Sequence, residues 1–222
     1  MKDKVVIFDL DDTLFNEIDF LISAYNEISQ FLSNYQGVNK SKNEIFDYMH
    51  SLYLRKKNPF EQVISFLNIK NIKTSDLLEI YRNHLPNISL NDDVIEVLDY
   101  LKYHKFIIGL ITDGRSIQQR NKIKALNLEN FISALVISEE FGSEKPNLEN
   151  FKFFEKKFPN SNYTYVGDNI NKDFIAPNQL NWDTICLLNN GKNIHSQNVL
   201  LPDSYLPKKY IKNIIEIIEI VS

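Results

Sequence analysis

Short apolar runs recur along this 222-residue chain, and most of them end in polar or glycine-bearing turns. They cover residues 5–8, 106–111, 135–137, 163–166 and 184–188. Such runs can be strands or buried helix, and here their short lengths and flanking turns favour strands. Helical patterns lie between them: residues 92–101 place apolar side chains along one face, and Ser116 and Gln119 are spaced as a capping box. Strands that alternate with helices predict a parallel sheet with helices on both faces.

Residues 15–89 break this alternation, because they contain helical patterns and no convincing strand pattern. The predicted helices cover residues 17–32, 42–55, 60–67 and 75–84. The stretch directly follows the first apolar run and precedes the helix that leads to the second. We therefore expect a Rossmann-like α/β core made of residues 1–14 and 90–222, interrupted by an all-helical domain at residues 15–89. A chain of this length fits one core with an insertion better than two full domains.

The overall charge argues against two large classes of partner. Twenty-five basic and 29 acidic residues give a formal net charge of −4, so nothing draws the whole molecule towards nucleic acid or an anionic membrane. The apolar fraction of 43% and the charged fraction of 24% are ordinary for globular proteins and argue against disorder. We expect a folded protein that binds an anion only locally, with no nucleic-acid or membrane partner.

The cysteine and histidine content favours a cytoplasmic protein without a zinc site. Cys186 is the single cysteine, so an internal disulfide is excluded. His50, His84, His104 and His195 show no paired spacing, which favours surface or helix-end positions over metal binding. Residues 5–8 form too short an apolar run for the core of a signal peptide, and polar residues interrupt the apolar run at residues 211–221.

Polar groups follow the predicted strands at their carboxyl ends. These groups are Asp9-Leu10-Asp11-Asp12-Thr13-Leu14, Thr112-Asp113-Gly114, Lys145-Pro146, and Gly167-Asp168 with Asp173 farther along. In open parallel sheets, ligands bind outside the carboxyl ends of the strands. We therefore expect all four groups to converge on one crevice.

The residue types in these groups suit a phosphoryl group and a divalent cation. Asp9 and Asp11 are two positions apart, which on a strand would place both on one face, and Asp168 can approach from a neighbouring strand. Close carboxylates repel one another unless a cation lies among them, and Mg²⁺ is a hard ion that prefers oxygen ligands. Lys145 and the donors of residues 112–114 would supply positive potential for phosphate oxygens.

In order and spacing, the four groups resemble the four motifs of the haloacid dehalogenase (HAD) superfamily. The likeness covers nearly the whole chain, and residues 138–146 also resemble the usual approach to the third motif. One Asp-x-Asp alone would be weak, because it occurs by chance. The resemblance implies a HAD fold, and the helical insertion is similar to the cap domain of C1-type members, which closes over the substrate.

The resemblance also implies a catalytic role for each aspartate of the first motif. Asp9 would attack phosphorus to form an aspartyl-phosphate, and Asp11 would protonate the leaving oxygen and then activate water. The dehalogenase branch needs no such acid and usually has another residue at the second position. Asp11 therefore favours a phosphatase, a phosphoric monoester hydrolase that acts on a small phosphorylated metabolite such as a sugar phosphate or nucleotide.

The same resemblance implies the binding residues. Asp9, the backbone carbonyl of Asp11, and Asp168 would hold Mg²⁺, while Asp173 would bind it through water or orient Lys145. The transferring phosphate would be held by Thr112, Lys145 and the backbone N–H groups of Asp113 and Gly114. Asp12 is expected to point away from the metal and cap the turn.

Other functions share part of this pattern. A phosphomutase of the same superfamily would return the phosphoryl group to its substrate instead of passing it to water. A receiver-type signalling domain also combines acidic residues, Thr, Lys and Mg²⁺, but is usually shorter and lacks a helical insertion after the first strand. A non-catalytic binder of a phosphorylated ligand would not need the complete set of catalytic positions.

Overall fold

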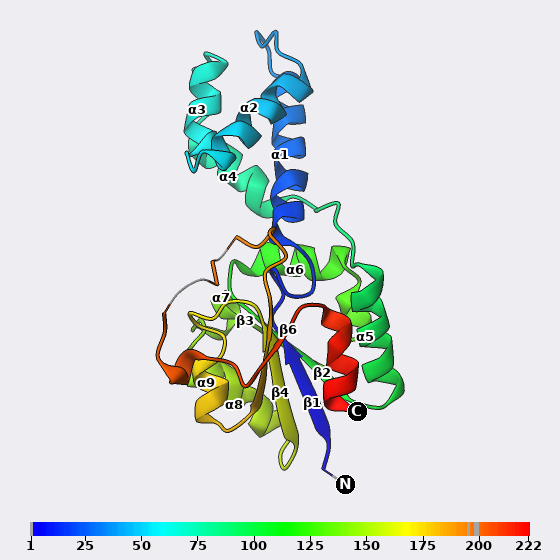
Figure 1. The fold of residues 1–222 in the computed structure, drawn as a ribbon. Helices are drawn as coiled ribbons and strands as arrows, with labels where there is room; N and C mark the ends of the chain where they lie inside the picture. The colour runs from blue at the N-terminus through cyan, green and yellow to red at the C-terminus, as the bar shows by residue number, and fades with distance from the viewer. Residues whose placement is uncertain (1, 195, 198–199) are drawn as a thin grey trace. The chain divides into compact units, whose positions relative to one another are not determined.

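The computed structural model describes residues 2–194, 196–197 and 200–222, so the position expected for His195 lies outside the described residues. The chain divides into two compact units (Figure 1). One unit combines Met1–Ile18 with Ser89–Ser222, and the other contains Asp19–Ile88. None of the helices in the described ranges is long and apolar enough to cross a bilayer.

The larger unit is built on a parallel six-stranded sheet with the order β3-β2-β1-β4-β5-β6. Its strands are β1 (Lys4–Phe8), β2 (Ile107–Thr112), β3 (Ala134–Ile137), β4 (Asn162–Gly167), β5 (Asp183–Leu187) and β6 (Lys209–Ile211). The five predicted strands and the α/β fold class are confirmed. β6 was not predicted, because only three residues pair and two of them are exposed.

Helices cover both faces of this sheet (Figure 1). The helices of the larger unit are α5 (Asp92–Tyr103), α6 (Ser116–Ala125), α7 (Ser138–Phe141), α8 (Leu148–Lys157), α9 (Ile175–Gln179) and α10 (Ile217–Val221), with short 3₁₀ turns at Leu128–Asn130, Asp203–Tyr205 and Ile214–Glu216. α5 and α10 lie on one face, and α8 and α9 on the other. Asp92 and Asp93 occupy the first turn of α5, where their negative charges interact favourably with the positive end of the helix dipole.

The face under α8 and α9 shows how closely the layers pack. Phe151 and Phe154 of α8 are fully buried in one cluster with Tyr165 of β4 and Trp182. Gly109 of β2 makes room for this layer, because a Cβ at that position would overlap the ring of Phe154. The packing fixes the central strands, and with them the residues at their carboxyl ends.

The smaller unit consists of helices joined by loops. It contains most of α1 (Glu17–Ser33), followed by α2 (Lys42–Leu54), α3 (Pro59–Phe66) and α4 (Thr74–Asn83). Ser41 and Glu44 form a capping box at the start of α2, and Asn58 caps α3 ahead of Pro59. Phe20 of α1 packs against His84, which is buried at the end of α4 and was expected at a surface or helix-end position.

Candidate active site

The carboxyl ends of the central strands bring the predicted aspartates and the threonine together. Asp9 follows β1, and its backbone N–H donates to Val166 of β4 at 2.8 Å. Thr112 is the last residue of β2, and Asp168 follows the end of β4. A pocket of about 140 Å³ lies at this edge and is lined by Asp9, Asp11, Asp12, Glu17, Asp113, Lys145, Asp168, Asn169 and Lys172.

Asp9, Asp168 and Asp173 form a buried acidic cluster, in which one carboxylate oxygen of each lies within 4.8 Å of the others. Burial is the main cause that raises the pKa of Asp9 to about 7 and that of Asp168 to about 8. The negative charge of Asp173 contributes to both of these increases. Carboxylates that resist ionisation here would be stabilised as anions by a hard divalent cation, so the cluster fits Mg²⁺.

Lys145 supplies positive charge beside this cluster. Its Nζ lies 2.8 Å from Asp9 Oδ1 and 2.7 Å from Asp173 Oδ1, and the three side chains are buried. Burial alone would lower the pKa of Lys145, but Asp173 and Asp9 raise it well above its usual value, so the lysine stays charged. The other oxygen of Asp173 accepts a hydrogen bond from the backbone N–H of Asn169 at 2.8 Å. Asp173 is therefore placed to orient Lys145.

Thr112, Asp113 and Gly114, at the end of β2, are held by hydrogen bonds and an ion pair to neighbouring side chains. Thr112 is fully buried, and its hydroxyl accepts a hydrogen bond from Gln119 Nε2. The Asp113 carboxylate lies 2.6 Å from Lys172 Nζ and also accepts the backbone N–H of Lys145 at 3.1 Å. The backbone N–H of Gly114 donates to Ser138 Oγ at 2.9 Å, so this predicted phosphate donor already has a protein acceptor.

Asp11 and Asp12 have surroundings different from those of Asp9. Asp11 Oδ1 lies 2.7 Å from Lys122 Nζ, and Asp11 Oδ2 accepts a hydrogen bond from Gln119 Nε2 at 2.9 Å. The Asp11 side chain is not a member of the buried acidic cluster found among the described residues. Asp12 accepts the backbone N–H of Glu17 at 2.9 Å and that of Ile194 at 2.7 Å, which confirms its expected capping role.

The predicted capping box of Ser116 and Gln119 is wrong. Arg115 precedes the first turn of α6, and its side chain makes no capping hydrogen bond. The Ser116 hydroxyl donates to Glu140, while Gln119 turns inward to Asp11 and Thr112. The Gln119 side chain therefore bonds residues outside α6 and does not cap the start of the helix.

Several polar residues at this edge were not predicted from the sequence. They are Glu17 and Lys172, which line the pocket, Gln119 and Lys122 of α6, and Asn193, whose Nδ2 donates to Asp168 Oδ2 at 2.8 Å. One signal was available for the pair on α6. Gln119 and Lys122 share a helical stripe with Ile123 and Leu126, and polar residues on a buried stripe need partners. Asn193 lies in a loop without periodicity.

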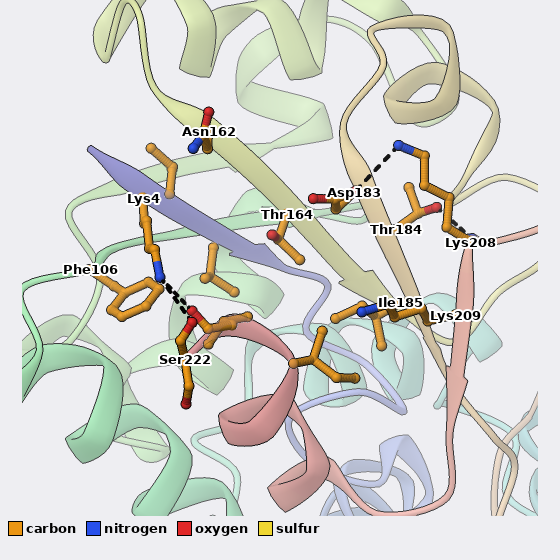
Figure 2. A pocket seen from close by; sticks show the side chains of 14 residues that line it. Lys4, Phe106, Asn162, Thr164, Asp183, Thr184, Ile185, Lys208, Lys209 and Ser222 are labelled. Atoms are coloured by element: carbon orange, nitrogen blue, oxygen red, sulfur yellow. Dashed lines mark hydrogen bonds and ion pairs between the residues drawn. The ribbon is translucent and has the colours of Figure 1, made fainter. Parts of the chain in front are cut away.

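A second, larger pocket lies at the amino ends of the strands, where Lys4, Thr164, Asp183 and Ser222 are among the lining residues (Figure 2). Its volume is about 250 Å³. Lys4 Nζ donates to the Val221 carbonyl at 2.7 Å, and Asp183, the one carboxylate side chain among its lining residues, pairs with Lys208 at 3.3 Å. It lacks the acidic cluster, so the smaller pocket is the candidate site.

Curated proteins similar to this chain are named as phosphatases or nucleotidases. A glyceraldehyde 3-phosphate phosphatase of Methanocaldococcus jannaschii is 28% identical over 194 residues, which cover 83% of this chain and 85% of the relative. The pyrimidine 5′-nucleotidase YjjG of Escherichia coli is 26% identical over 187 residues, which cover 79% of this chain and 82% of the relative.

A solved structure and a family model also match this chain. The putative HAD-hydrolase YfnB of Bacillus subtilis, solved with bound magnesium, matches with a TM-score of 0.70 and 18% identity over 100% of both chains. That likeness shows the fold alone. The family model described as haloacid dehalogenase-like hydrolase matches residues 6–187, from β1 to the end of β5. With all four motifs gathered at one edge of the sheet, the chain belongs to the haloacid dehalogenase-like hydrolases.

Proposed function

We propose that this protein is a Mg²⁺-dependent phosphatase that hydrolyses small phosphate monoesters through an aspartyl-phosphate. The observation that carries the proposal is the contrast between two aspartates in one pocket. Asp9 lies beside Lys145 in the buried acidic cluster, whereas Asp11 is held apart from it by Lys122 and Gln119. Two carboxyl groups in different surroundings can take different roles, one as nucleophile and the other as acid and base.

Asp9 is the proposed nucleophile. One of its oxygens is paired with Lys145, which leaves the other for attack on phosphorus and formation of an acyl phosphate. Asp11 would begin this step protonated and give its proton to the departing alkoxide oxygen, so that an alcohol leaves and Asp11 becomes the carboxylate that pairs with Lys122. In the second step Asp11 would remove a proton from water, which attacks the acyl phosphate and releases inorganic phosphate with regeneration of Asp9.

The same arrangement supports the proposed metal and phosphate sites. Asp9, Asp168 and the backbone carbonyl of Asp11 would hold Mg²⁺. The bound ion would reduce the repulsion between a carboxylate nucleophile and an anionic phosphate. Lys145 and the Thr112 hydroxyl would donate to the phosphate oxygens, and Asp173 would keep Lys145 in place.

The proposed substrates are small phosphate monoesters, with sugar phosphates and nucleotides as the first classes to test. The names of the two curated relatives support these classes, because one indicates a triose phosphate and the other a pyrimidine nucleotide. We also propose that residues 15–89 act as a C1-type cap, whose role would be to exclude water from the reaction.

Phosphate release from a panel of phosphate esters tests the proposal. The panel contains glyceraldehyde 3-phosphate, other sugar phosphates and pyrimidine nucleotides, each with Mg²⁺ and with a chelator. Wild type should release phosphate only with the metal, and Asp9→Asn should reduce release at least about a thousandfold because no nucleophile remains. Asp183→Asn is the matched control, since this exposed carboxylate lies at the other end of the sheet, and it should keep full activity.

Two results would reject the proposal. An inactive wild type across the panel would exclude these substrates, and full activity of Asp9→Asn would exclude the nucleophile. Product analysis also separates hydrolysis from mutase chemistry. Free phosphate together with the alcohol supports hydrolysis, while an isomerised phosphate ester whose formation requires a bisphosphate would support a phosphomutase.

A further inference from the structure

We propose that Lys122 of α6 is a positioning residue for Asp11, and that Gln119 one turn earlier is its partner in this role. Together they would hold the carboxyl group of the general acid against the leaving-group side of the pocket. This inference rests on the proposed phosphatase function. It adds two positioning residues that lie outside the four motifs, on a helix that supplies none of the motif side chains.

The geometry consists of one donor for each oxygen of Asp11. Lys122 Nζ lies 2.7 Å from Oδ1, and Gln119 Nε2 donates to Oδ2 at 2.9 Å. Gln119 Nε2 also reaches Thr112 Oγ1 and the Asp113 carbonyl, which ties this hold to the end of β2. A carboxylate that accepts a hydrogen bond at each oxygen cannot rotate about its Cβ–Cγ bond without losing one of them.

The burial of Lys122 makes a purely structural role costly. The residue is 1% exposed and lies on the stripe of α6 that also buries Ile123 and Leu126. A buried ammonium group is stable only when it is paired, and an apolar side chain at this position would continue the stripe without that cost. Besides Asp11, Lys122 has Glu17 Oε1 at 3.9 Å and the Phe15 ring at 5.7 Å, so Asp11 is its nearer carboxylate.

The contact of Lys122 with Asp11 has a specific consequence for the reaction. Asp11 lies two residues after Asp9, close to the acidic cluster that would gather the metal. Without the ammonium group, the Asp11 carboxylate would be free to turn towards a cation in that cluster. It would then be misplaced for proton transfer, while Asp9, Lys145 and Asp168 would keep their own contacts. Loss of Lys122 should therefore impair protonation of the leaving oxygen more than binding or attack.

Leaving-group dependence tests this consequence. p-Nitrophenyl phosphate releases a stable phenolate and needs little protonation, whereas glycerol phosphate releases an alkoxide that needs an acid. Lys122→Met should lower kcat on glycerol phosphate at least about tenfold more than on p-nitrophenyl phosphate, with KM nearly unchanged. Lys124→Met is the matched control, because this lysine is exposed on the same helix and should behave as wild type.

A double-mutant cycle separates positioning from a general disturbance of the fold. In an Asp11→Asn background, Lys122→Met should cause no further loss on glycerol phosphate, because the group that it positions is already absent. Lys122→Arg, which keeps the charge and the donors, should recover part of the loss. Gln119→Leu removes the other donor and should give the same dependence on the leaving group, so the test stands even if Lys122→Met does not fold.

Equal losses on the two substrates, or full additivity with Asp11→Asn, would overturn the inference while leaving the phosphatase proposal intact. A wild type that releases no phosphate from any ester would instead overturn the phosphatase proposal, and this inference with it.

Discussion

The Lys145 ammonium nitrogen lies 2.7 Å from Asp173 Oδ1, and both side chains are closed off from solvent. Lys145→Met should therefore lower the free energy of unfolding by about 3–5 kcal/mol, because it leaves buried carboxylates without a counter-charge. Urea unfolding at pH 7 without Mg²⁺ measures this. Lys152→Met, which breaks the exposed pair with Glu149, should show no measurable change. Equal stability of Lys145→Met and wild type would show that the carboxylates need no lysine.

The close approach of α8 to β2 predicts a steric effect at Gly109. Gly109→Ala should destabilise the protein by about 1–3 kcal/mol, because the new methyl group overlaps the Phe154 ring. Thermal or urea unfolding reports the loss. Adding Phe154→Leu removes the ring, so the double variant should lose less than the sum of the two single variants. Strict additivity would mean that the two positions do not meet in solution.

Glu17 predicts a pH dependence of stability. Burial and the nearby charge of Asp11 raise the pKa of Glu17 to about 8, with Lys122 opposing the shift. A carboxyl group with a raised pKa favours folding most below its unfolded pKa, near 4.5, and this contribution is lost as the pH rises towards 8.

Glu17→Gln removes this titration. Its stability relative to wild type should therefore increase by at least about 1 kcal/mol from pH 5 to pH 7, measured by urea unfolding without Mg²⁺. A constant difference between the two proteins across this range would contradict the raised pKa.

Cys186 should be inert towards thiol reagents in the folded protein. Its side chain is fully buried in β5, and burial, with Asp168 and Asp173, raises its pKa to about 12. At pH 8 the reactive thiolate should be about a thousandfold scarcer than for an ordinary thiol. Labelling with iodoacetamide should therefore be slow in buffer and fast in urea. Rapid labelling without denaturant would show that β5 opens readily.

The regular part of the fold could be predicted because its elements have strong local patterns. The apolar runs located five strands, and the periodicity located the four helices of the smaller unit to within one or two residues at each end. β6 could not be found in this way. Its pairing with β5 fixes Lys209, Tyr210 and Ile211 as an edge strand, although Lys209 and Tyr210 are exposed.

The candidate site likewise contains residues that the sequence pattern could locate and contacts that depend on how distant elements pack. Asp9, Thr112, Lys145 and Asp168 were predicted because parallel strands bring their carboxyl ends to one edge, and the structure places all four there. Gln119 was misassigned because a capping box is a local pattern, whereas its actual partners, Asp11 and Thr112, are fixed only when α6 packs beside the strand ends. The Gly114 N–H donates to Ser138 of α7, and this long-range contact could not be predicted from the sequence either.

The central place of β1 in the sheet affects how the protein must assemble during synthesis. Val5 pairs with Ile107 on one side and Tyr163 on the other, so β1 is synthesised before either of the strands that it pairs with. Until they are made, its apolar residues have no sheet to join, and closing such long loops slows folding. Asp9 can therefore join Asp168 in the acidic cluster only after β4 and the residues that follow it have been made.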